Sequence, residues 1–381
     1  MQWYIDQDIL PCINTLVMRG TEVLDYKCFG YMDIANNTPL REDAIYRMYS
    51  NTKLVTSVAL MQLYEQGKFQ LQDSLADFIP VFADLQVLIP GATAIDQTEP
   101  LQSPITIAQV LSHTAGFSYG FIEPESVIDG AYLGNGLNIF SGFSGDLADL
   151  MDKMSQFPLA YQPGTGWRYS LATDVAARLV EVLSGQRFDD YLQSRIFGPL
   201  GMVDTGFYVA PEKLERLVTM AAPNNIFDPM AGGLTRMDTP ESVTSTPNFL
   251  SGGGGLYSTV ADYLSFVRMM ISGGEWGGVR ILQTETLQLM RESQLAEGVT
   301  VQFPAWAMPG TEFGLGFAVK TAIAEDEPTA ALGEYHWGGM AGTHSWMSPW
   351  GTSGMCMTQL MPGFWHPFSH DFKRYAYQLT Q

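Results

Sequence analysis

The sequence predicts an α+β fold, in which an antiparallel sheet built from both ends of the chain is flanked by helices and a mostly helical region is inserted between the two ends. Short β-prone runs with Gly-containing breaks occur near the start and return near the end. Between about residues 75 and 240, helical patterns separated by Pro- and Gly-bearing loops predominate. We therefore expect a sheet domain formed by residues 1–75 and 245–381, and a mostly helical domain formed by residues 76–244.

The individual elements follow from local patterns. The predicted strands are residues 14–20, 22–31, 44–49, 313–321, 343–347 and 354–360. The residues Pro349 to Gly351 are expected to form the turn between the last two strands. The predicted helices are residues 52–66, 107–113, 174–184, 188–196 and 260–272. Apolar side chains cover most of the circumference of helix 52–66, and Gly67 stands where a C-cap belongs, so this helix should be central and buried.

Composition excludes several classes of protein. The chain has 381 residues, of which 46% are hydrophobic and only 16% charged, so it can build a large core. Forty acidic and 20 basic residues give a net charge of −20, which argues against nucleic-acid and membrane partners. Three cysteines are too few for a disulfide framework. The N-terminal residues lack the pattern of a signal peptide, so a cytoplasmic location is expected.

The uncharged stretch 335–370 carries no Asp, Glu, Lys or Arg, but its many Gly and Pro residues would break a membrane-spanning helix. We interpret it as buried strands and turns.

One serine and one lysine stand out as a candidate catalytic pair. Lys53, one of seven lysines, follows Ser50 by three residues. On a helix, this spacing places an amine beside a hydroxyl, that is, a proton acceptor beside a nucleophile. An apolar helix favours the neutral amine. By itself, the short pattern S-x-x-K is equally consistent with a capping serine followed by a solvated lysine.

Two further motifs give the chain a resemblance to the serine β-lactamase-like superfamily. Tyr169 lies in Pro163-Gly164-Thr165-Gly166-Trp167-Arg168-Tyr169-Ser170-Leu171, which matches the family's second motif. The segment His336-Trp337-Gly338-Gly339 matches the third, a Lys-Thr-Gly or His-x-Gly element on a strand. With Ser50 and Lys53, these motifs resemble the class C branch, which includes class C β-lactamases, D-alanyl-D-alanine carboxypeptidases and family VIII carboxylesterases. The resemblance covers roughly residues 12 to 375 and implies a β-lactamase/D-Ala carboxypeptidase-like fold.

This resemblance implies acyl transfer through a covalent serine ester. Ser50 would be the nucleophile, and Lys53 and Tyr169 would act as a coupled pair that accepts its proton, with the identity of the base left open. The oxyanion would be stabilised by the N–H of Ser50 and a second N–H from the third motif. That donor is Gly339 if the motif begins at His336, or Met340 if it begins at Trp337. No metal or other cofactor is expected.

Departures from the family pattern bear on the substrate. β-Lactamases and peptidases carry Asn two residues after the tyrosine, where this chain has Leu171. The lactamases begin the third motif with Lys, which suits a substrate carboxylate, whereas His336 or Trp337 has no permanent charge. A small-molecule ester without a carboxylate therefore fits better. The expected substrate-binding residues, each of which could also be ordinary packing, are Trp337, His336, Gly338, Leu171, Phe117, Tyr119 and Trp306.

Other motifs compete with this assignment. Gly116-Phe117-Ser118-Tyr119-Gly120 matches the G-x-S-x-G nucleophile elbow, but it lacks the strand before and the helix after that the elbow needs. We expect it to shape a loop. The histidines have no metal-binding spacing, so structural roles are favoured for His113, His336, His344, His366 and His370.

The predicted function is thus a serine carboxylesterase acting on short acyl esters. The alternatives are a β-lactamase or D-alanyl peptidase, an acyltransferase of the same fold, and a penicillin-binding-like module without turnover. The oligomeric state is left open.

Overall fold

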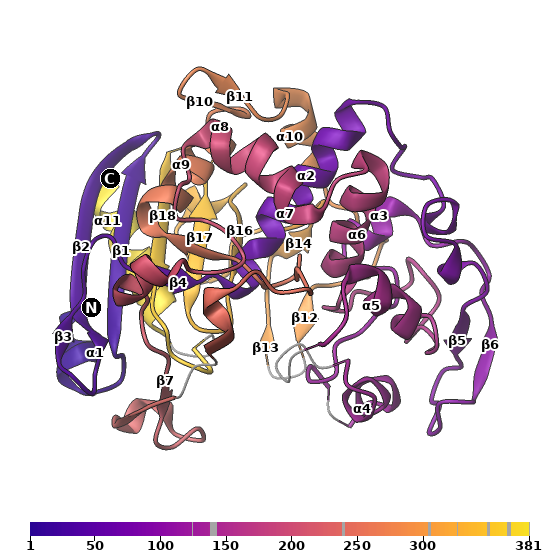
Figure 1. Ribbon diagram of the computed structural model, residues 1–381, viewed down its shortest axis with the longest axis horizontal. Coiled ribbons are helices and arrows are strands. Elements are labelled where there is room, and N and C mark those ends of the chain that lie inside the picture. Colours follow the sequence, from indigo (N-terminus) through magenta and orange to yellow (C-terminus); the bar gives the residue numbers. More distant parts are fainter. Residues whose placement is uncertain are drawn as a thin grey trace.

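A central antiparallel sheet is assembled from the two ends of the chain (Figure 1). The computed structural model describes residues 1–123, 125–137, 143–237, 241–303, 306–325, 327–348, 351–363 and 367–380. Within them the sheet has eight strands, in the spatial order β14 (Thr311–Phe313), β15 (Ala318–Lys320), β16 (Tyr335–Gly338), β17 (Thr343–Met347), β18 (Thr352–Met357), β1 (Cys12–Arg19), β2 (Glu22–Asp33) and β3 (Thr38–Pro39). The pairing of β18 with β1 joins the two ends of the chain in one sheet and agrees with the fold predicted from sequence.

Helices cover both faces of this sheet and fill the middle of the chain. They are α1 (Gln2–Asp6), α2 (Thr52–Glu65), α3 (Ile107–Leu111), α4 (Val127–Gly134), α5 (Leu147–Met154), α6 (Ala172–Ser184), α7 (Phe188–Leu192), α8 (Gly198–Leu200), α9 (Val260–Ile271), α10 (Thr284–Met290) and α11 (Phe368–Thr380). A π-helical turn, Gln193–Phe197, joins α7 to α8. In Figure 1, α3 to α6 lie on the opposite side of α2 from the strands β1 and β2. The division into a sheet domain and a helical domain at residues 75 and 245 stays a prediction.

Short two-stranded pairs complete the fold. They are β4 (Ile45–Arg47) with β9 (Tyr257–Thr259), β5 (Gln86–Leu88) with β6 (Thr98–Pro100), β7 (Ala221–Pro223) with β8 (Leu234–Arg236), β10 (Glu275–Trp276) with β11 (Val279–Arg280), and β12 (Gln302–Phe303) with β13 (Trp306–Ala307). The pair β4–β9 matters for the site because β4 leads into the turn η1 (Tyr49–Asn51), which contains Ser50, and β9 leads into α9, whose Tyr263 bonds to that turn.

The strand β1 shows why the sheet is buried on both sides. Successive side chains of a strand point to opposite faces. Leu16 belongs to the main core, which also contains side chains of α2 and α9. Ile13 and Val17 belong to a second core with Trp346 and Phe372, formed with α1 and α11. Because both faces are covered, every residue of β1 except Arg19 is buried.

One predicted strand is in fact a hairpin. The β-prone run 313–321 contains the end of β14, a turn and the strand β15, with Phe313 opposite Ala318. The turn includes Gly316, whose φ of +106° is accessible to glycine but costly for other residues. The run therefore reverses direction, and its two ends pair with each other. The turn predicted at residues 349–351 falls mostly outside the described residues, although β17 and β18 do pair as antiparallel neighbours.

The helix α2 is the central element. Of its fourteen residues, eleven are buried, including the polar side chains Thr52, Lys53, Thr56 and Ser57. Its C-terminus is followed by Gly67 with a φ of +69°, as expected of a C-cap glycine. The predicted burial of this helix is confirmed, so Lys53 points into the protein rather than into water.

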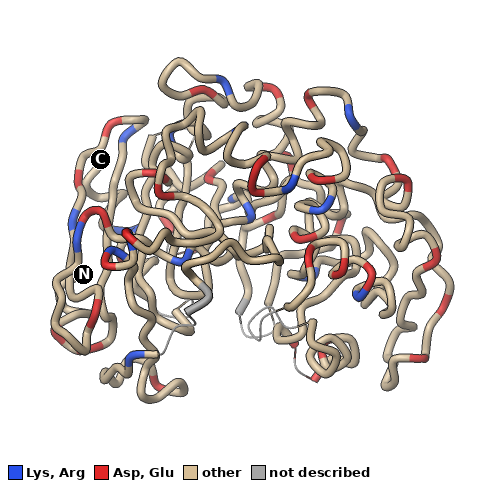
Figure 2. The backbone as a smooth tube through the Cα atoms, viewed as in Figure 1, with Lys and Arg blue, Asp and Glu red and all other residues tan. Residues whose placement is uncertain are grey.

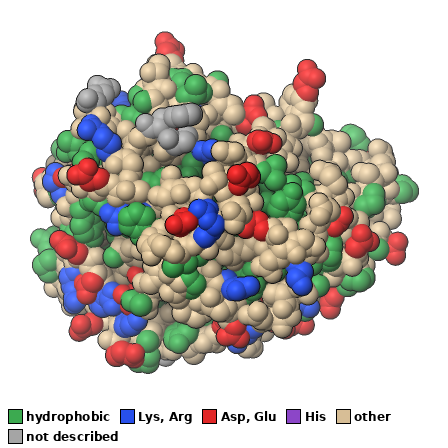
Figure 3. Space-filling model, turned by 90° about the horizontal axis from the view of Figure 1, so that it is seen from above, with side chains coloured by type: hydrophobic (Ala, Val, Ile, Leu, Met, Phe, Trp, Pro, Cys, Tyr) green, Lys and Arg blue, Asp and Glu red, His purple; other side chains and the backbone are tan. Residues whose placement is uncertain are grey.

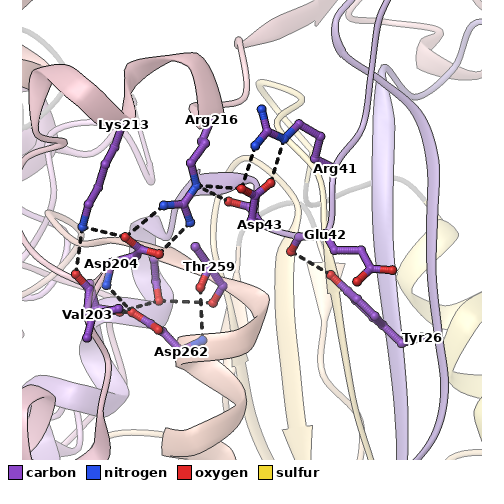
Figure 4. Close-up of polar contacts among 12 residues, drawn as sticks. Tyr26, Arg41, Glu42, Asp43, Val203, Asp204, Lys213, Arg216, Thr259 and Asp262 are labelled. Carbon is purple, nitrogen blue, oxygen red and sulfur yellow. Dashed lines mark hydrogen bonds and ion pairs between the residues drawn. The ribbon is translucent and has the colours of Figure 1, made fainter.

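Charged contacts tie distant segments together (Figure 4). Arg216 lies between two carboxylates: its guanidinium donates to Asp204 at 2.6 and 3.1 Å and pairs with the Asp43 carboxylate at 3.2 Å. It also donates to the backbone carbonyl of Asp43 at 2.9 Å. Lys213 also pairs with Asp204, at 2.7 Å. These contacts fasten the segment that follows α8 to the loop before β4.

The excess of acidic residues is spread along the chain rather than gathered in one segment (Figure 2). On the face drawn in Figure 3, acidic, basic and apolar side chains are interspersed. None of the helices in the described residues is long and apolar enough to cross a membrane.

Candidate active site

Ser50 lies in a short 3₁₀ turn, η1 (Tyr49–Asn51), that runs directly into α2. Tyr49, just before the serine, has a φ of +45°, which is a strained conformation for an aromatic residue. Contacts from elsewhere hold the turn in place: the Tyr263 hydroxyl donates to the carbonyl of Asn51 at 3.0 Å, and the Ser345 hydroxyl donates to its side chain at 3.0 Å. The position of Ser50 is therefore set by α9 and β17 as well as by its own helix.

Lys53 is buried beside Ser50, with 1% of its surface exposed. Its Nζ lies 3.5 Å from Ser50 Oγ and donates to the Gly253 carbonyl at 2.7 Å and to the Tyr119 hydroxyl at 2.9 Å. Burial lowers the pKa of Lys53 to about 7, against a smaller opposing effect of Asp174. A substantial fraction of the amine is thus neutral near pH 7 and able to accept a proton.

Tyr169 approaches the same point from the segment before α6. Its ring centroid lies 4.6 Å from Lys53 Nζ, and its hydroxyl accepts a hydrogen bond from Trp337 Nε1 at 3.0 Å. Burial raises the pKa of Tyr169, while its hydrogen bonds with Ser50 and Trp337 oppose this rise. The phenol is therefore protonated at neutral pH and is suited to pass a proton between its neighbours.

Two residues that the sequence did not assign to the base also face Lys53. Tyr119, expected only as a pocket wall, accepts the Lys53 hydrogen bond and is itself 1% exposed. Asp174, in the first turn of α6, is fully buried and opposes the lowering of the Lys53 pKa. The one sequence signal for either residue is the run Gly252 to Gly255, which lets the chain pass close to these groups.

The turn between β16 and β17 distinguishes the two candidate oxyanion donors. The Gly339 N–H already donates to the Thr343 carbonyl at 2.5 Å. Among the described residues, no acceptor is found for the N–H of the next residue, Met340. The turn sits against the nucleophile, because the Thr343 hydroxyl donates to the Met48 carbonyl at 2.9 Å. This geometry favours Met340 over Gly339, and Trp337 over His336 as the first residue of the motif.

Aromatic rings surround Tyr169. Its ring centroid lies 5.2 Å from that of Trp337 and 5.5 Å from that of Phe303, and Trp167 is stacked at 6.3 Å. Phe313 packs edge-on against Trp337 at 5.3 Å. The wall beside the candidate base is therefore apolar.

Comparisons with known proteins identify the family of this chain. The family profile described as "Beta-lactamase" matches residues 4–363. The chain belongs to the beta-lactamase family.

Relatives within the beta-lactamase family include several esterases. The chain is 33% identical to Protein Rv1367c of Mycobacterium tuberculosis over 89% of this chain and 82% of that protein. It is 28% identical to Esterase EstB of Burkholderia gladioli over 87% of this chain and 81% of that protein. Among solved structures, that of "EstCE1, a hydrolase with promiscuous acyltransferase activity" superposes with a TM-score of 0.82 at 25% identity, covering 99% and 96% of the two chains. The chain is a beta-lactamase-fold protein, with esterases and acyltransferases among its relatives.

Two expected substrate-binding residues point away from this beta-lactamase-like site. In β16, Trp337 faces Tyr169, so the alternation of the strand turns His336 to the opposite face. There the His336 ring lies 5.6 Å from that of His344. A Cβ on Gly338 would likewise lie 3.1 Å from His344 Nδ1. The expectation that His336 and Gly338 contact substrate is wrong for the face that carries Trp337 and Tyr169, because alternate residues of a strand point to opposite faces.

Two others are core residues. Leu171 is completely buried, and its N–H donates to the carbonyl of Ser118. Phe117 is 1% exposed and packs against Phe82, with ring centroids 5.3 Å apart. Neither side chain lines an open surface, so both expectations are corrected. The side chain of Trp306 lies outside the described part of the structure.

Ser118 of the G-x-S-x-G segment is a structural residue. It is fully buried, donates to the Asp129 carboxylate, and accepts from Arg168 Nε at 2.6 Å. Arg168 also pairs with Asp129 at 3.0 Å and with Glu123 at 2.7 Å. This buried network holds the loop that carries Tyr119 next to the segment that carries Tyr169.

Proposed function

We propose that this protein is a serine carboxylesterase that hydrolyses short-chain acyl esters through an acyl-Ser50 intermediate. The observation that carries the proposal is the buried Lys53 amine, which lies 3.5 Å from Ser50 Oγ and has a pKa lowered to about 7. A neutral amine beside a hydroxyl is a general base beside a nucleophile.

The reaction follows from these positions. Ser50 Oγ attacks the ester carbonyl while its proton passes to the coupled pair Lys53 and Tyr169. The N–H groups of Ser50 and Met340 stabilise the oxyanion. When the tetrahedral intermediate collapses, the pair returns the proton to the leaving alcohol. A water molecule that gives its proton to the same pair then attacks the acyl-enzyme. The second tetrahedral intermediate releases the acid and expels Ser50 Oγ, which takes the proton back from the pair.

The residues around the base support esters without a carboxylate. Leu171 offers no amide where β-lactamases and peptidases carry Asn, and it is completely buried. Trp337 stands where a lysine would bind a substrate carboxylate and uses its indole N–H on Tyr169 instead. The rings of Trp167, Phe303 and Trp337 give an apolar wall suited to a short acyl chain or an alcohol.

A second candidate is acyl transfer to an alcohol. It is favoured by the aromatic rings around Tyr169, since a site with few polar groups holds water poorly. The structural relative EstCE1 is described as a hydrolase with promiscuous acyltransferase activity, so one protein of this fold combines both reactions. The two candidates share one acyl-enzyme and differ in which nucleophile releases it.

The test is steady-state hydrolysis of p-nitrophenyl acetate, butyrate and octanoate beside a chromogenic cephalosporin, for the wild type, Ser50→Ala and Ser118→Ala. We expect Ser50→Ala to lose about 10³-fold or more in kcat with the folded state preserved. Ser118→Ala should keep ester turnover, and mass spectrometry of quenched wild type should find the acyl group on the peptide containing Ser50.

Other outcomes would replace the proposal. Cephalosporin turnover well above that of every ester would identify a β-lactamase. One acylation burst without turnover would identify a binding module, and loss of activity only in Ser118→Ala would move the nucleophile. Added ethanol or butanol distinguishes the esterase from the acyltransferase, because an acyltransferase then forms the new ester faster than the free acid.

A further inference from the structure

Asp174 is a buried carboxylate that the proposed reaction does not use. It lies in the first turn of α6 and is 0% exposed. Its Oδ1 accepts hydrogen bonds from the Ser251 hydroxyl at 2.8 Å and from the Gly253 N–H at 3.1 Å. Its Oδ2 has no hydrogen-bond partner among the described residues. Burying a carboxylate with one oxygen unpaired is costly, so its position calls for an explanation.

The Gly253 peptide connects this carboxylate to the candidate base. Its N–H donates to Asp174, and its carbonyl accepts from Lys53 Nζ at 2.7 Å. A Cβ on Gly253 would lie 2.7 Å from Asp174 Oδ2, 2.9 Å from the Tyr119 hydroxyl and 3.3 Å from Lys53 Nζ. Only a glycine fits there, and the unpaired carboxylate oxygen faces the same small volume as the amine.

The charges around Lys53 make Asp174 distinctive. The titratable groups that face the amine are Tyr119, Tyr169, His113 and Asp174. Burial raises the pKa of both tyrosines and lowers that of the histidine, so these three are uncharged at neutral pH. Burial raises the pKa of Asp174, and the nearby Lys53 together with the hydrogen bonds from Ser251 and Gly253 opposes this rise. The N-terminal end of α6 also favours the ionised form. Asp174 is thus the anion available when Lys53 becomes an ammonium.

We propose that Asp174 is a positioning residue of this site: it anchors the Gly253 carbonyl that holds Lys53, and its carboxylate balances the charge that Lys53 gains on accepting the Ser50 proton. This inference rests on the proposed function of Ser50 and Lys53. A buried ammonium without a counter-charge is strongly disfavoured, so the carboxylate stabilises the acylation transition state relative to the resting site.

The test compares Asp174→Asn with Asp262→Asn in the pH profile of kcat/KM for p-nitrophenyl butyrate. Asp262 is a matched control, because it is also a buried carboxylate at the third residue of a helix, but it bonds to the Asp204 N–H and the Thr205 hydroxyl (Figure 4). Asp174 raises the pKa of Lys53, so removing its charge lowers that pKa further. We expect the acid limb of Asp174→Asn to move about 1 pH unit down and its plateau to fall about 10-fold. The limb of Asp262→Asn should stay in place.

An acid limb of folded Asp174→Asn that coincides with that of the wild type would overturn the inference. If Asp174→Asn does not fold, Ser251→Ala decides, because it removes one donor to Asp174 Oδ1 and weakens the ionised form. The acid limb of Ser251→Ala should also move to lower pH, by a smaller amount than that of Asp174→Asn. An acid limb that stays in place would count against the positioning role of Asp174. Ester turnover that survives in Ser50→Ala would instead refute the proposed function itself.

Discussion

At the scale of single residues, the pKa of Lys53 governs the proposed reaction. Burial disfavours the ammonium, so the pKa is lowered to about 7 and the neutral amine predominates above that pH. We expect kcat/KM for p-nitrophenyl butyrate to rise with a midpoint near pH 7 and to fall away below it. Lys53→Arg, which cannot give up its proton, should lose about 10³-fold in kcat at every pH. Lys320→Arg, at another buried lysine, should keep the wild-type profile, and activity in Lys53→Arg would exclude lysine as the base.

Trp337 should act through its indole N–H. The hydrogen bond to the Tyr169 hydroxyl lowers the pKa of that phenol, which burial raises. Trp337→Phe keeps an aromatic ring and removes this donor, so we expect kcat to fall about 5-fold, in line with about 1 kcal/mol for one hydrogen bond. Stopped-flow acylation measurements together with Tm would check this. An unchanged acylation rate would assign Trp337 to packing alone.

At the scale of elements, the close approach of the β16–β17 turn to η1 should be the sensitive contact. A Cβ on Gly339 would lie 2.2 Å from Thr343 Oγ1 and 2.4 Å from the Met48 carbonyl, so the turn would have to move away from Ser50. We expect Gly339→Ala to lower kcat at least about 10²-fold and to cost about 1–3 kcal/mol of stability.

Gly254→Ala is the control for that substitution. A Cβ there would meet the backbone of Tyr49 at 3.8 Å, which is ordinary van der Waals contact. Assays of kcat and urea denaturation on both variants would separate the two glycines. Equal losses in both would show that the site responds to any added methyl group and not to the displaced turn.

At the scale of the whole molecule, Arg216 should be a main link between the segment after α8 and the loop before β4. Its pair with Asp204 is largely shielded from water, with 17% and 13% of the two side chains exposed, whereas its second partner, Asp43, is 46% exposed (Figure 4). We expect Arg216→Ala to lower the free energy of unfolding by about 1–3 kcal/mol, because Asp204 then loses a buried partner.

Arg41 is the control for Arg216, because it also pairs with Asp43 but the Arg41 and Asp43 side chains are 45% and 46% exposed. Arg41→Ala should change stability by no more than about 0.5 kcal/mol, as exposed ion pairs contribute little. Urea denaturation at low and high salt measures the change in the free energy of unfolding for both variants. Equal effects of the two substitutions would contradict the role given to Arg216.

Local patterns in the sequence were sufficient for the parts of the molecule that depend on near neighbours. The spacing of Ser50 and Lys53 already places them one helical turn apart, and Gly67 marks the end of α2 with a positive φ. Alternating and helical periodicity also indicated a sheet built from both chain ends around a helical insertion. These features follow from the geometry of a single element, so the residue order contains them.

The tertiary structure alone decided which distant groups meet. Whether His336 or Trp337 faces Tyr169 depends on strand register, because a shift of one residue exchanges the two faces of a strand. The engagement of the Gly339 N–H, which underlies our proposal of Met340 as oxyanion donor, depends on a hydrogen bond across the β16–β17 turn. Likewise, Asp174 and Lys53 are far apart in sequence and come together only because the Gly253 peptide passes between α2 and α6. Contacts of this kind depend on how elements pack, and no local pattern in the chain encodes them.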